Sequence, residues 1–358
     1  MLTITRPFLP TKTTFQAKLN QIWDCRYLTN HGPLYTELNS LLEARASLLH
    51  AYVSNGTISL QLLLKSLGCS GEIVTTPFSY VATTNAILWE GGTPVFADVD
   101  PKTCNADPEA VERAIGPNTK GLLFTHVYGI PCDVEALEKL AEKHGIWLVF
   151  DAAHAFDVQY KGRSLFSYGT AASASYHATK IFHTVEGGGV YSKDEELMRA
   201  VRQLMNFGHT SPETFDRPGI NAKNSEFHAA MGLCILPYMP EIIARRKALS
   251  QRYDAQIPKG LSRPNLPEGT EYNYAYYPVF FPNQEALLHT KAALEQAGIG
   301  TRRYFYPSLN TLPYLSETQA CPLSEDLSSR VLCLPLYPDL SDLEQEYILD
   351  HLHRNFKE

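Results

Sequence analysis

Residues 175–189 read SYHATKIFHTVEGGG and place Lys180 between a strand of small residues and a run of three glycines. Hydroxyls, imidazoles and glycines are unusual in a core turn, but they suit a backbone that approaches a phosphorylated ring. A lysine in this setting can form a Schiff base with an aldehyde cofactor. The stretch therefore predicts a pyridoxal phosphate enzyme, whose other parts must supply an acid for the pyridine nitrogen, a phosphate site and an aromatic side chain that stacks on the ring.

A carboxylate suited to the pyridine nitrogen ends the run WLVFD, residues 147–151. Asp151 closes what reads as a buried strand, and ligands of open α/β sheets bind at the carboxyl ends of strands. There it would keep the ring nitrogen protonated, although a helix-capping aspartate is the alternative interpretation. Lys180 follows Asp151 by 29 residues, enough for a loop and one strand, so the two residues together favour a cofactor site.

A phosphate site is predicted where Ser54-Asn55-Gly56-Thr57 precedes an amphipathic helix, because the first amides of a helix bind anions. A simple helix cap is the alternative for this segment. Ser175 could add a hydroxyl to the phosphate, or it is a strand serine satisfied by its neighbours. Tyr80 begins another helix at the same edge of the expected sheet and could stack on the ring, although plain packing would also place an aromatic residue there.

Two consecutive arginines, Arg302 and Arg303, precede Tyr304-Phe305-Tyr306-Pro307 and form the best candidate for a substrate anion site. The alternative is a solvated charged turn. We take Arg302, Arg303, Phe305 and Tyr306 as the candidate substrate-binding residues.

Neither a metal site nor a disulfide framework is expected. The spacings of His154, His177 and His183 do not match a helical i, i+4 pair, and no carboxylate or cysteine is placed to complete a zinc site. The cysteines are scattered, odd in number and without a C-x-x-C pair, which indicates reduced thiols and a cytoplasmic protein. They stand at positions 25, 69, 104, 132, 234, 321 and 333.

Composition narrows the class of protein. The chain has 358 residues, 44% hydrophobic and 19% charged, which is typical of a soluble globular protein with two domains. Its formal charge of −7 argues against binding to nucleic acid or to an anionic membrane. Neither a signal peptide nor a membrane span is expected, because no window approaches eighteen apolar residues.

Apolar runs alternate with helix-patterned segments, which predicts a mostly parallel sheet with helices on both faces. The expected strands cover 72–77, 94–99, 121–127, 147–151, 170–176, 189–192, 276–281 and 332–336. The expected helices cover 13–24, 34–46, 57–67, 80–90, 107–115, 133–144, 194–205, 225–236, 241–252, 284–297 and the segment from 342 onward. Pro237 and Pro240 impose a break or kink. We therefore expect a large α/β domain with an N-terminal arm over 1–240 and a small α+β domain over 241–358.

Taken together, these motifs resemble the DegT/DnrJ/StrS family of sugar aminotransferases in order and spacing over nearly the whole chain. Further matches are Gly32-Pro33, the segment GTPVFADVD at 92–100 and the closing LPLYP at 334–338. The resemblance implies an aspartate-aminotransferase-like, fold-type I homodimer with active sites at the subunit interface.

The resemblance also implies roles for single residues. Lys180 would carry pyridoxal 5′-phosphate covalently, Asp151 would pair with the pyridine nitrogen, Tyr80 would stack on the ring and His154 would lie near the ring hydroxyl. The phosphate would be held by Gly56, Thr57, Ile58 and Ser175.

Two departures from the family pattern concern the remaining site residues. Lys223 stands where many relatives have arginine or asparagine, and it would reach the partner subunit's cofactor phosphate as a point charge rather than a fork. The family's frequent His-Tyr-Pro is Phe305-Tyr306-Pro307 here, so no role of that histidine transfers. The segments 221–232 and 301–309 look most like the VioA-type branch, whose members aminate dTDP-4-keto-6-deoxy-D-glucose at C4.

The predicted reaction is a ping-pong transamination from L-glutamate to a keto sugar nucleotide, in the biosynthesis of deoxyamino sugars such as those of O-antigen lipopolysaccharide. The alternatives with the same chemistry are a 3-keto sugar nucleotide or a keto-cyclitol as the acceptor. A related sugar dehydratase would have histidine in place of Lys180. An inactive, cofactor-binding regulator is the alternative of another class.

Overall fold

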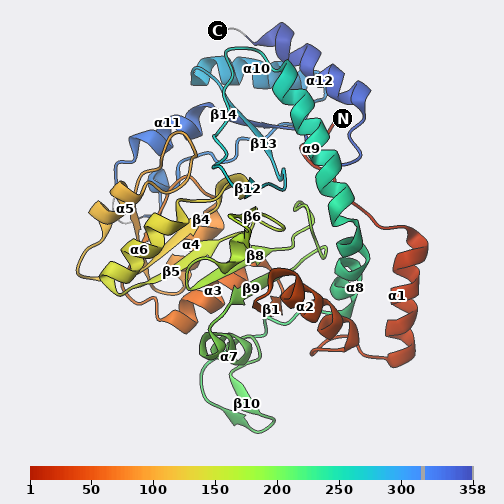
Figure 1. Ribbon diagram of the computed structural model, residues 1–358, viewed down its shortest axis with the longest axis vertical. Coiled ribbons are helices and arrows are strands. Elements are labelled where there is room, and N and C mark those ends of the chain that lie inside the picture. The colour runs from red at the N-terminus through yellow and green to blue at the C-terminus, as the bar shows by residue number, and fades with distance from the viewer. Residues whose placement is uncertain (316–318, 357–358) are drawn as a thin grey trace.

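The computed structural model describes residues 1–315 and 319–356, and its centre is a seven-stranded sheet. The strand order is β1-β9-β8-β5-β4-β2-β3 (Figure 1). The bounds are β1 Leu49–Val53, β2 Glu72–Thr75, β3 Thr93–Phe96, β4 Thr119–Thr125, β5 Trp147–Asp151, β8 Ala171–Ser175 and β9 Gly188–Ser192. The pairings from β3 through β8 are parallel, and β9 is antiparallel to both β8 and β1. The prediction of a mostly parallel sheet is confirmed.

The helices fall close to their predicted positions. They are α1 Lys12–Cys25, α2 Pro33–Ala46, α3 Gly56–Leu67, α4 Val81–Trp89, α5 Pro108–Ala114, α6 Val134–His144, α7 Glu195–Leu204, α8 Glu226–Ile235, α9 Met239–Gln256, α10 Gln284–Gln296, α11 Pro322–Arg330 and α12 Asp342–Asn355. The helices α3, α4 and α7 form one packed group against the sheet, and α5 and α6 form another. Of the sheet strands and helices named so far, β1 and α11 were not predicted.

The position of Gly32 and Pro33 at the start of α2 explains why these two residue types occur there. Pro33 occupies the first turn, where its missing N–H costs nothing. The buried Glu226 carboxylate accepts hydrogen bonds from the amides of Leu34 and Tyr35, both at 2.8 Å. A Cβ on Gly32 would lie 2.6 Å from the Glu226 side chain, so glycine is required for this close approach. Residues almost 200 positions apart are joined here.

A second hydrophobic core lies beyond the sheet domain. It is built on the antiparallel pair β13 Tyr277–Phe280 and β14 Val331–Leu334 and on residues of α9, α10 and α12. The first core extends to Ile242, and the second begins at Leu249. The chain thus passes between the cores within α9, which runs along one side of the molecule (Figure 1). The division at residue 240 stays a prediction.

The predicted break at Pro237 and Pro240 is a short 3-10 turn, Leu236–Tyr238, which joins α8 to α9. By length and composition the whole run Glu226–Gln256 could cross a membrane, although no membrane span was expected from the sequence. More than half of its most apolar window is buried inside the molecule, which is the pattern of a core helix.

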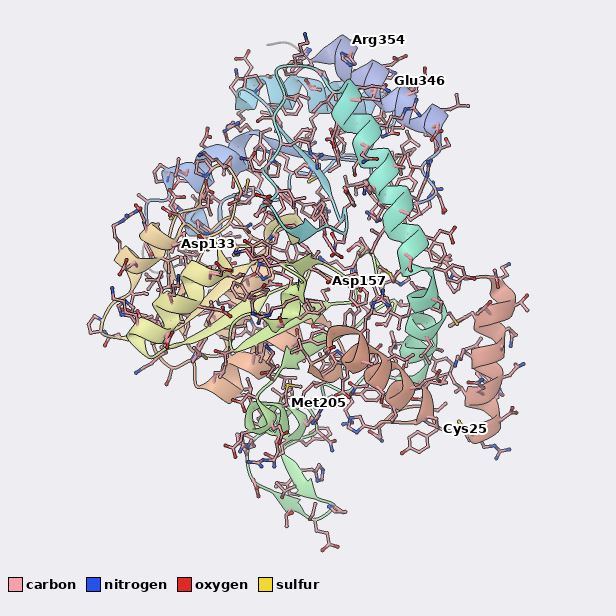
Figure 2. The ribbon with its side chains drawn as sticks, in the orientation of Figure 1. Cys25, Asp133, Asp157, Met205, Glu346 and Arg354 are labelled. Carbon is pink, nitrogen blue, oxygen red and sulfur yellow. The ribbon has the colours of Figure 1, made fainter. Side chains whose placement is uncertain are left out.

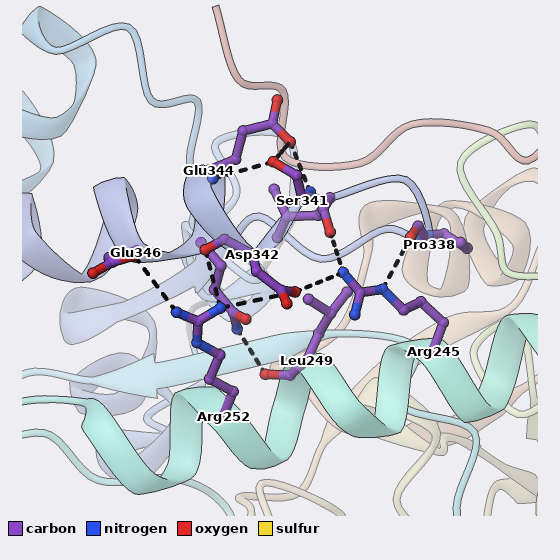
Figure 3. Close-up of polar contacts among 10 residues, drawn as sticks. Arg245, Leu249, Arg252, Pro338, Ser341, Asp342, Glu344 and Glu346 are labelled. Atoms are coloured by element: carbon purple, nitrogen blue, oxygen red, sulfur yellow. Dashed lines mark hydrogen bonds and ion pairs between the residues drawn. The ribbon is translucent and has the colours of Figure 1, made fainter.

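Polar contacts fasten α12 onto α9 (Figure 3). Ser341 and Glu344 form a capping box at the start of α12. Arg245 donates to the Leu340 carbonyl at 2.6 Å and to the Asp342 carboxylate at 3.0 Å. The Gln345 side chain donates to the Leu249 carbonyl at 2.7 Å inside the core. The exposed ion pairs add little energy by themselves, so the buried contacts dominate.

The first residues of the chain also attach to the second core. Leu2 forms a parallel bridge with Ile299, with bonds to Gly298 and Gly300 of 2.8 and 2.7 Å. The Leu336 amide donates to the Ile4 carbonyl at 3.1 Å. The N-terminal arm therefore crosses from the second core to α1 before the sheet domain begins.

Five short strands, none of them predicted, complete the described strands. They are β6 Gln159–Tyr160, β7 Arg163–Ser164, β10 His209–Ser211, β11 Thr214–Phe215 and β12 Thr270–Glu271. β12 pairs with β6, so the segment that leads into the second core is tied back to the sheet domain.

Candidate active site

Lys180 lies in the turn between the antiparallel strands β8 and β9. Backbone bonds from Tyr176 to Gly187 and from Ala178 to Val185, both 2.8 Å, continue the ladder beyond the strands. The lysine amide donates to the His177 carbonyl at 2.8 Å, which turns the side chain toward the carboxyl edge of the sheet. Burial lowers the pKa of the Lys180 amine, and the nearby Asp151 carboxylate opposes this effect.

Most of the predicted residues line one cavity of about 650 Å³ at this edge of the sheet. Those that line it are Gly56, Thr57, Ile58, Tyr80, Asp151, His154, Ser175, Lys180, Arg302 and Phe305. A second cavity of about 600 Å³ surrounds the ion pair between Arg45 and Asp157, and none of the predicted residues lines it. Asp157 is labelled in Figure 2.

Asp151 is held at the end of β5 by two hydrogen bonds. One carboxylate oxygen accepts from the Thr83 hydroxyl at 2.8 Å, and the other accepts from the Ala153 amide at 3.1 Å. Burial raises the pKa of this carboxyl, while the two bonds and Lys180 lower it. The helix-cap interpretation does not account for this buried position inside the cavity. A buried carboxylate without a cation bonded to it is suited to receive one.

The predicted phosphate site is the N-terminus of α3. The Asn55 side chain caps the helix by accepting from the Ile58 amide at 2.9 Å, so the cap interpretation is correct for this amide. The prediction for Ile58 needs correction, because its N–H is already bonded, although the residue lines the cavity. The amides of Gly56 and Thr57 belong to the first turn, which has no intrahelical acceptor for them.

Gly56 has to be glycine because strand β8 passes so close. A Cβ at this position would lie 2.9 Å from Cβ and 3.2 Å from Oγ of Ser175. A Cβ on Gly188 would meet the Asn55 carbonyl at 2.4 Å, so the glycine run serves the same close approach. The prediction that the glycines let the backbone pass close by agrees with this packing.

His154 and Phe305 form an aromatic stack at one wall of the cavity. Their rings are 5.7 Å apart with an interplanar angle of 4°, and Phe305 stacks in turn on Tyr128. Nδ1 of His154 accepts from the Tyr128 amide at 3.1 Å. Burial keeps the pKa of His154 well below its usual value, so the imidazole is neutral. Phe305 thus supports the histidine as well as lining the cavity.

Three predicted residues do not line this cavity. Arg303 points away, because its guanidinium donates to the carbonyls of Ser328 and Ser329 and covers the Tyr306 ring at 3.5 Å. The structure therefore does not place Arg303 in the cavity as a substrate anion site, nor Tyr306, which is half exposed beneath it, and both roles stay predictions. Lys223 donates to Asn206 at 2.9 Å and lies over the Phe207 ring.

Sequence reasoning missed two tyrosines that line the cavity, Tyr276 and Tyr304. The Tyr276 hydroxyl accepts a hydrogen bond from Lys180 Nζ at 3.3 Å. Tyr276 belongs to the tyrosine-rich segment before β13, where nothing in the alternation of residues says which ring faces the lysine. At the rim, His177 and Glu186 form a 3.5 Å pair.

A sequence model described as the DegT/DnrJ/EryC1/StrS aminotransferase family matches residues 11–353. The chain belongs to this family. It is 35% identical to the dTDP-4-amino-4,6-dideoxy-D-glucose transaminase of Escherichia coli, over 95% of this chain and 94% of the relative. It is 32% identical to the UDP-2-acetamido-2-deoxy-3-oxo-D-glucuronate aminotransferase of Pseudomonas aeruginosa, over 86% of this chain and 87% of the relative.

A solved structure agrees with the assignment of this chain to the DegT/DnrJ/EryC1/StrS aminotransferase family. The crystal structure of DesI in the presence of its TDP-sugar product superposes with a TM-score of 0.93 at 34% identity, over 99% of this chain and 92% of that one. The chain is therefore a sugar-nucleotide transaminase of the aspartate-aminotransferase-like fold, and its cofactor is pyridoxal 5′-phosphate.

The residues present in this DegT/DnrJ/EryC1/StrS aminotransferase fit that cofactor. The space between the start of α3 and Ser175, which we call the cradle, would be filled by a Cβ on Gly56. The backbone amides of Gly56 and Thr57 are free there to bind a phosphate. Asp151 is a buried carboxylate that lacks a bonded cation, and a protonated pyridine nitrogen would supply one. The Lys180 amine stands in the same cavity. The described residues contain no cluster of three His, Cys, Asp or Glu suited to a metal ion.

Proposed function

We propose that this enzyme moves the amino group of L-glutamate to C4 of dTDP-4-keto-6-deoxy-D-glucose, giving dTDP-4-amino-4,6-dideoxy-D-glucose. The observation that carries the proposal is the placement of Lys180 and Asp151 in one cavity beside the α3 N-terminus. The substrate is suggested by the two relatives named as dTDP-4-amino-4,6-dideoxy-D-glucose transaminases, from Escherichia coli and Shigella dysenteriae, each 35% identical to this chain.

Each predicted residue has a task in this reaction. When bound, pyridoxal phosphate supplies the carbon that carries the amino group and the ring that takes up an electron pair. Lys180 holds the cofactor, and its amine, once free, moves the proton between the substrate carbon and the cofactor. Asp151 keeps a proton on the ring nitrogen. Tyr80, half exposed at the start of α4, covers one face of the ring.

The phosphate and the substrate complete the assignment. Gly56, Thr57 and Ser175 hold the phosphate. Neutral His154 lies beside the ring hydroxyl, on the support of Phe305. Arg302 lines the cavity and has no carboxylate partner among the described ion pairs, so it is the cation for a substrate carboxylate or phosphate.

The working enzyme is proposed to be a homodimer with active sites at the interface. Large apolar side chains are exposed on α1 and on the β10–β11 hairpin with its flanking segments, which include Trp23, Phe207, Phe215 and Ile220. Such surfaces favour association. Lys223 lies over Phe207 in the same region, where it would reach the partner's cofactor phosphate. The enzyme would act in the cytoplasm, in deoxyamino sugar supply for polysaccharides such as O-antigen.

The experiment has two stages that read the two substrates separately. L-glutamate is added to the purified holoenzyme, and absorbance should show loss of the aldehyde form together with release of 2-oxoglutarate. The aminated enzyme is then offered a panel of keto sugar nucleotides, and the product is identified by NMR. Amination of dTDP-4-keto-6-deoxy-D-glucose at C4 supports the proposal. A bound cofactor that glutamate does not convert would instead indicate the inactive regulator.

A second candidate acceptor is a sugar nucleotide with its ketone at C3. The Pseudomonas aeruginosa relative, whose name specifies a 3-oxo sugar, is 32% identical to this chain and supports this alternative. The same panel separates the two, because amination at C3 and at C4 give different proton couplings on the sugar ring. A keto-cyclitol in the panel tests the remaining acceptor.

A further inference from the structure

The Lys180 amine has one hydrogen-bond partner among the described residues, the hydroxyl of Tyr276 at 3.3 Å. The other titratable groups that act on this amine are Asp151 at the end of β5, Tyr80 at the start of α4 and Tyr304, and none of them is bonded to it. Tyr276 comes from the segment that precedes β13. A residue near the second core thus holds the reactive group of the sheet domain.

The segment that presents Tyr276, residues 273–276, is bonded to the loop that directly follows β5, the strand that ends at Asp151. Asn273 is fully buried, and its side-chain Nδ2 donates to the backbone carbonyls of His154 and Phe156, both at 2.8 Å. The Asn273 side-chain oxygen Oδ1 accepts from the Ala275 amide at 3.0 Å, which closes a tight turn. This side chain therefore fixes the segment relative to the cofactor end of β5.

A buried arginine pins the same segment from the other side. Arg246 of α9 is 2% exposed and donates through Nη1 to the carbonyls of Tyr274 and Ala275, at 3.3 and 3.2 Å. No described carboxylate pairs with it, and burial lowers its pKa to about 10. An arginine that is buried without a counter-ion is costly, and its observed contacts serve the backbone that carries Tyr276.

Aromatic packing fixes the Tyr276 ring itself. The ring meets His154 edge-on at 4.8 Å, and Tyr304 packs against it at 5.5 Å with an interplanar angle of 81°. Restrained at its backbone and at its ring, the hydroxyl has little freedom to leave Lys180. Such restraint is what positions a catalytic group within the small tolerance that proton transfer requires.

We propose that Tyr276 is a catalytic residue that holds the Lys180 amine in place whenever that amine is not covalently engaged, and that Arg246 is a positioning residue that acts through the segment 273–276. The proposal rests on the transamination proposed above, since the amine must be held ready to move a proton between substrate and cofactor. It gives α9, the helix between the two cores, a direct effect on the chemistry.

The hydrogen bond has a measurable electrostatic consequence. A charged ammonium donates a stronger hydrogen bond than a neutral amine, so the Tyr276 hydroxyl favours the protonated form of Lys180. Removal of the hydroxyl should lower the pKa of Lys180 and leave the amine less well placed. The amine would then be more often neutral and yet slower in the half-reaction, a combination that loss of general stability does not produce.

Tyr276→Phe tests the first part of the proposal. The apoenzyme is labelled with trace isotopic acetic anhydride over a range of pH, and mass spectrometry of the Lys180 peptide gives the pKa of its amine. The holoenzyme is mixed with L-glutamate in a stopped-flow instrument. We expect a lower Lys180 pKa and a roughly tenfold slower half-reaction. A tenfold change in rate corresponds to the free energy that one hydrogen bond contributes. The proposal is overturned if Tyr276→Phe has the same pH profile of labelling at Lys180 and the same half-reaction rate as the wild-type enzyme.

Tyr272→Phe is the matched control, because Tyr272 stands in the same segment and its hydroxyl donates to the Tyr128 carbonyl rather than to the lysine. It should leave the labelling profile of Lys180 unchanged. If it shifts the profile as Tyr276→Phe does, the effect belongs to the segment as a whole and the assignment of Tyr276 fails.

Arg246→Met tests the second part. It should lower the Lys180 pKa and slow the half-reaction in the same direction as Tyr276→Phe but less. Combined with Tyr276→Phe it should add little, because both act on one contact. Arg246→Lys keeps a donor and should restore most of the rate, and it replaces the Met variant if that protein does not fold. Additive losses in the double variant overturn the role of Arg246.

The labelling arm needs neither substrate nor cofactor. If the wild-type enzyme fails to react with glutamate, the proposed transamination fails while the labelling still tests the contact between Tyr276 and Lys180. The two proposals can therefore fail separately.

Discussion

Burial has opposite effects on the two groups that define the active site. It raises the pKa of the Asp151 carboxyl and lowers the pKa of the Lys180 amine, because each loses the water that stabilises its charge. Each group therefore moves toward its neutral form in the same cavity. Only the neutral form of an amine is a nucleophile, so the lowered pKa of Lys180 favours its attack on an aldehyde. A cofactor with a protonated nitrogen would restore the charge of Asp151.

Replacement of Asp151 by asparagine should separate cofactor chemistry from folding. The amide retains an oxygen for the Thr83 hydroxyl but no longer stabilises a proton on the ring nitrogen. We expect turnover to fall about 10²- to 10³-fold, as for other losses of preorganised electrostatic stabilisation. Asp133→Asn is the control, since Asp133 is an exposed cap of α6, labelled in Figure 2. Equal turnover of Asp151→Asn and wild type would contradict the role of Asp151.

Lys180 should capture pyridoxal phosphate at a lower pH than an ordinary lysine would. Only the neutral amine attacks the aldehyde, so the capture rate of the apoenzyme should rise with pH and level off above the pKa of Lys180. Because burial lowers that pKa, the midpoint should lie below that of a solvent-exposed lysine. Stopped-flow absorbance of apoenzyme mixed with the cofactor measures the midpoint, with a lysine peptide as reference. A midpoint equal to the peptide's would be evidence against a buried amine.

Gly56→Ala should damage both packing and cofactor binding, and a second substitution separates them. The new Cβ would press on Ser175, which we expect to cost about 1–3 kcal/mol in the free energy of unfolding. Ser175→Gly added to it should recover the stability but not the affinity for pyridoxal phosphate, because the methyl group remains in the cradle and the Ser175 hydroxyl is also lost. Gly116→Ala is the control, since its Cβ would meet only Glu72 at 3.4 Å. Titration of the apoenzyme measures the affinity.

At the scale of elements, periodicity in the sequence predicts a helix or strand better than it predicts which way a side chain points. The strands that end at Asp151 and begin at Gly188 were predicted because their residues are apolar, small and bounded by turn signals. β1 was missed because LHAYV holds a buried histidine and follows α2 after two residues. The directions of Arg302 and Arg303 depend on the bridge between Arg302 and Cys333, a contact that pairs distant segments.

The cap that joins α8 to α2 should contribute measurably to stability. In Glu226→Gln an amide NH2 group replaces one carboxylate oxygen and faces a backbone N–H, so one of the two buried backbone N–H groups loses its acceptor. We expect a loss of about 1–3 kcal/mol in the free energy of unfolding, measured by urea titration. Glu213→Gln, on the exposed β10–β11 hairpin, should change it little. An unchanged midpoint for Glu226→Gln would show that water replaces the carboxylate.

At the scale of the whole molecule, buried histidines make the fold sensitive to acid. Burial lowers the pKa of both His50 and His126 to about 3. His50 joins several elements, because Nδ1 bonds the Asn39 side chain at 2.9 Å and Nε2 bonds the Tyr176 hydroxyl at 3.0 Å. The Asn39 oxygen can only accept, so Nδ1 carries the proton and Nε2 receives one from tyrosine. A second proton on this fully buried ring would place a charge away from water, which burial disfavours.

The free energy of unfolding should therefore fall as the pH drops below 6.5. Unfolded histidine takes up a proton near that pH, whereas the folded His126 resists it down to about 3, so stability rises with pH across this window. At pH 5.5 the loss is about 1.4 kcal/mol for each such histidine. Urea titrations at pH 7.5 and 5.5 measure it. His126→Gln should reduce the difference between the two pH values by about this amount, and an unchanged difference would contradict the assignment.

The attachment of residues 2–4 to the second core has a consequence for biosynthesis. Their partners, around Ile299 and Leu336, leave the ribosome some 300 residues later. Residues 2–4 therefore have no partners until the sheet domain and helix α9 have been synthesised. The segment made first among those described is thus one of the last that can reach its place.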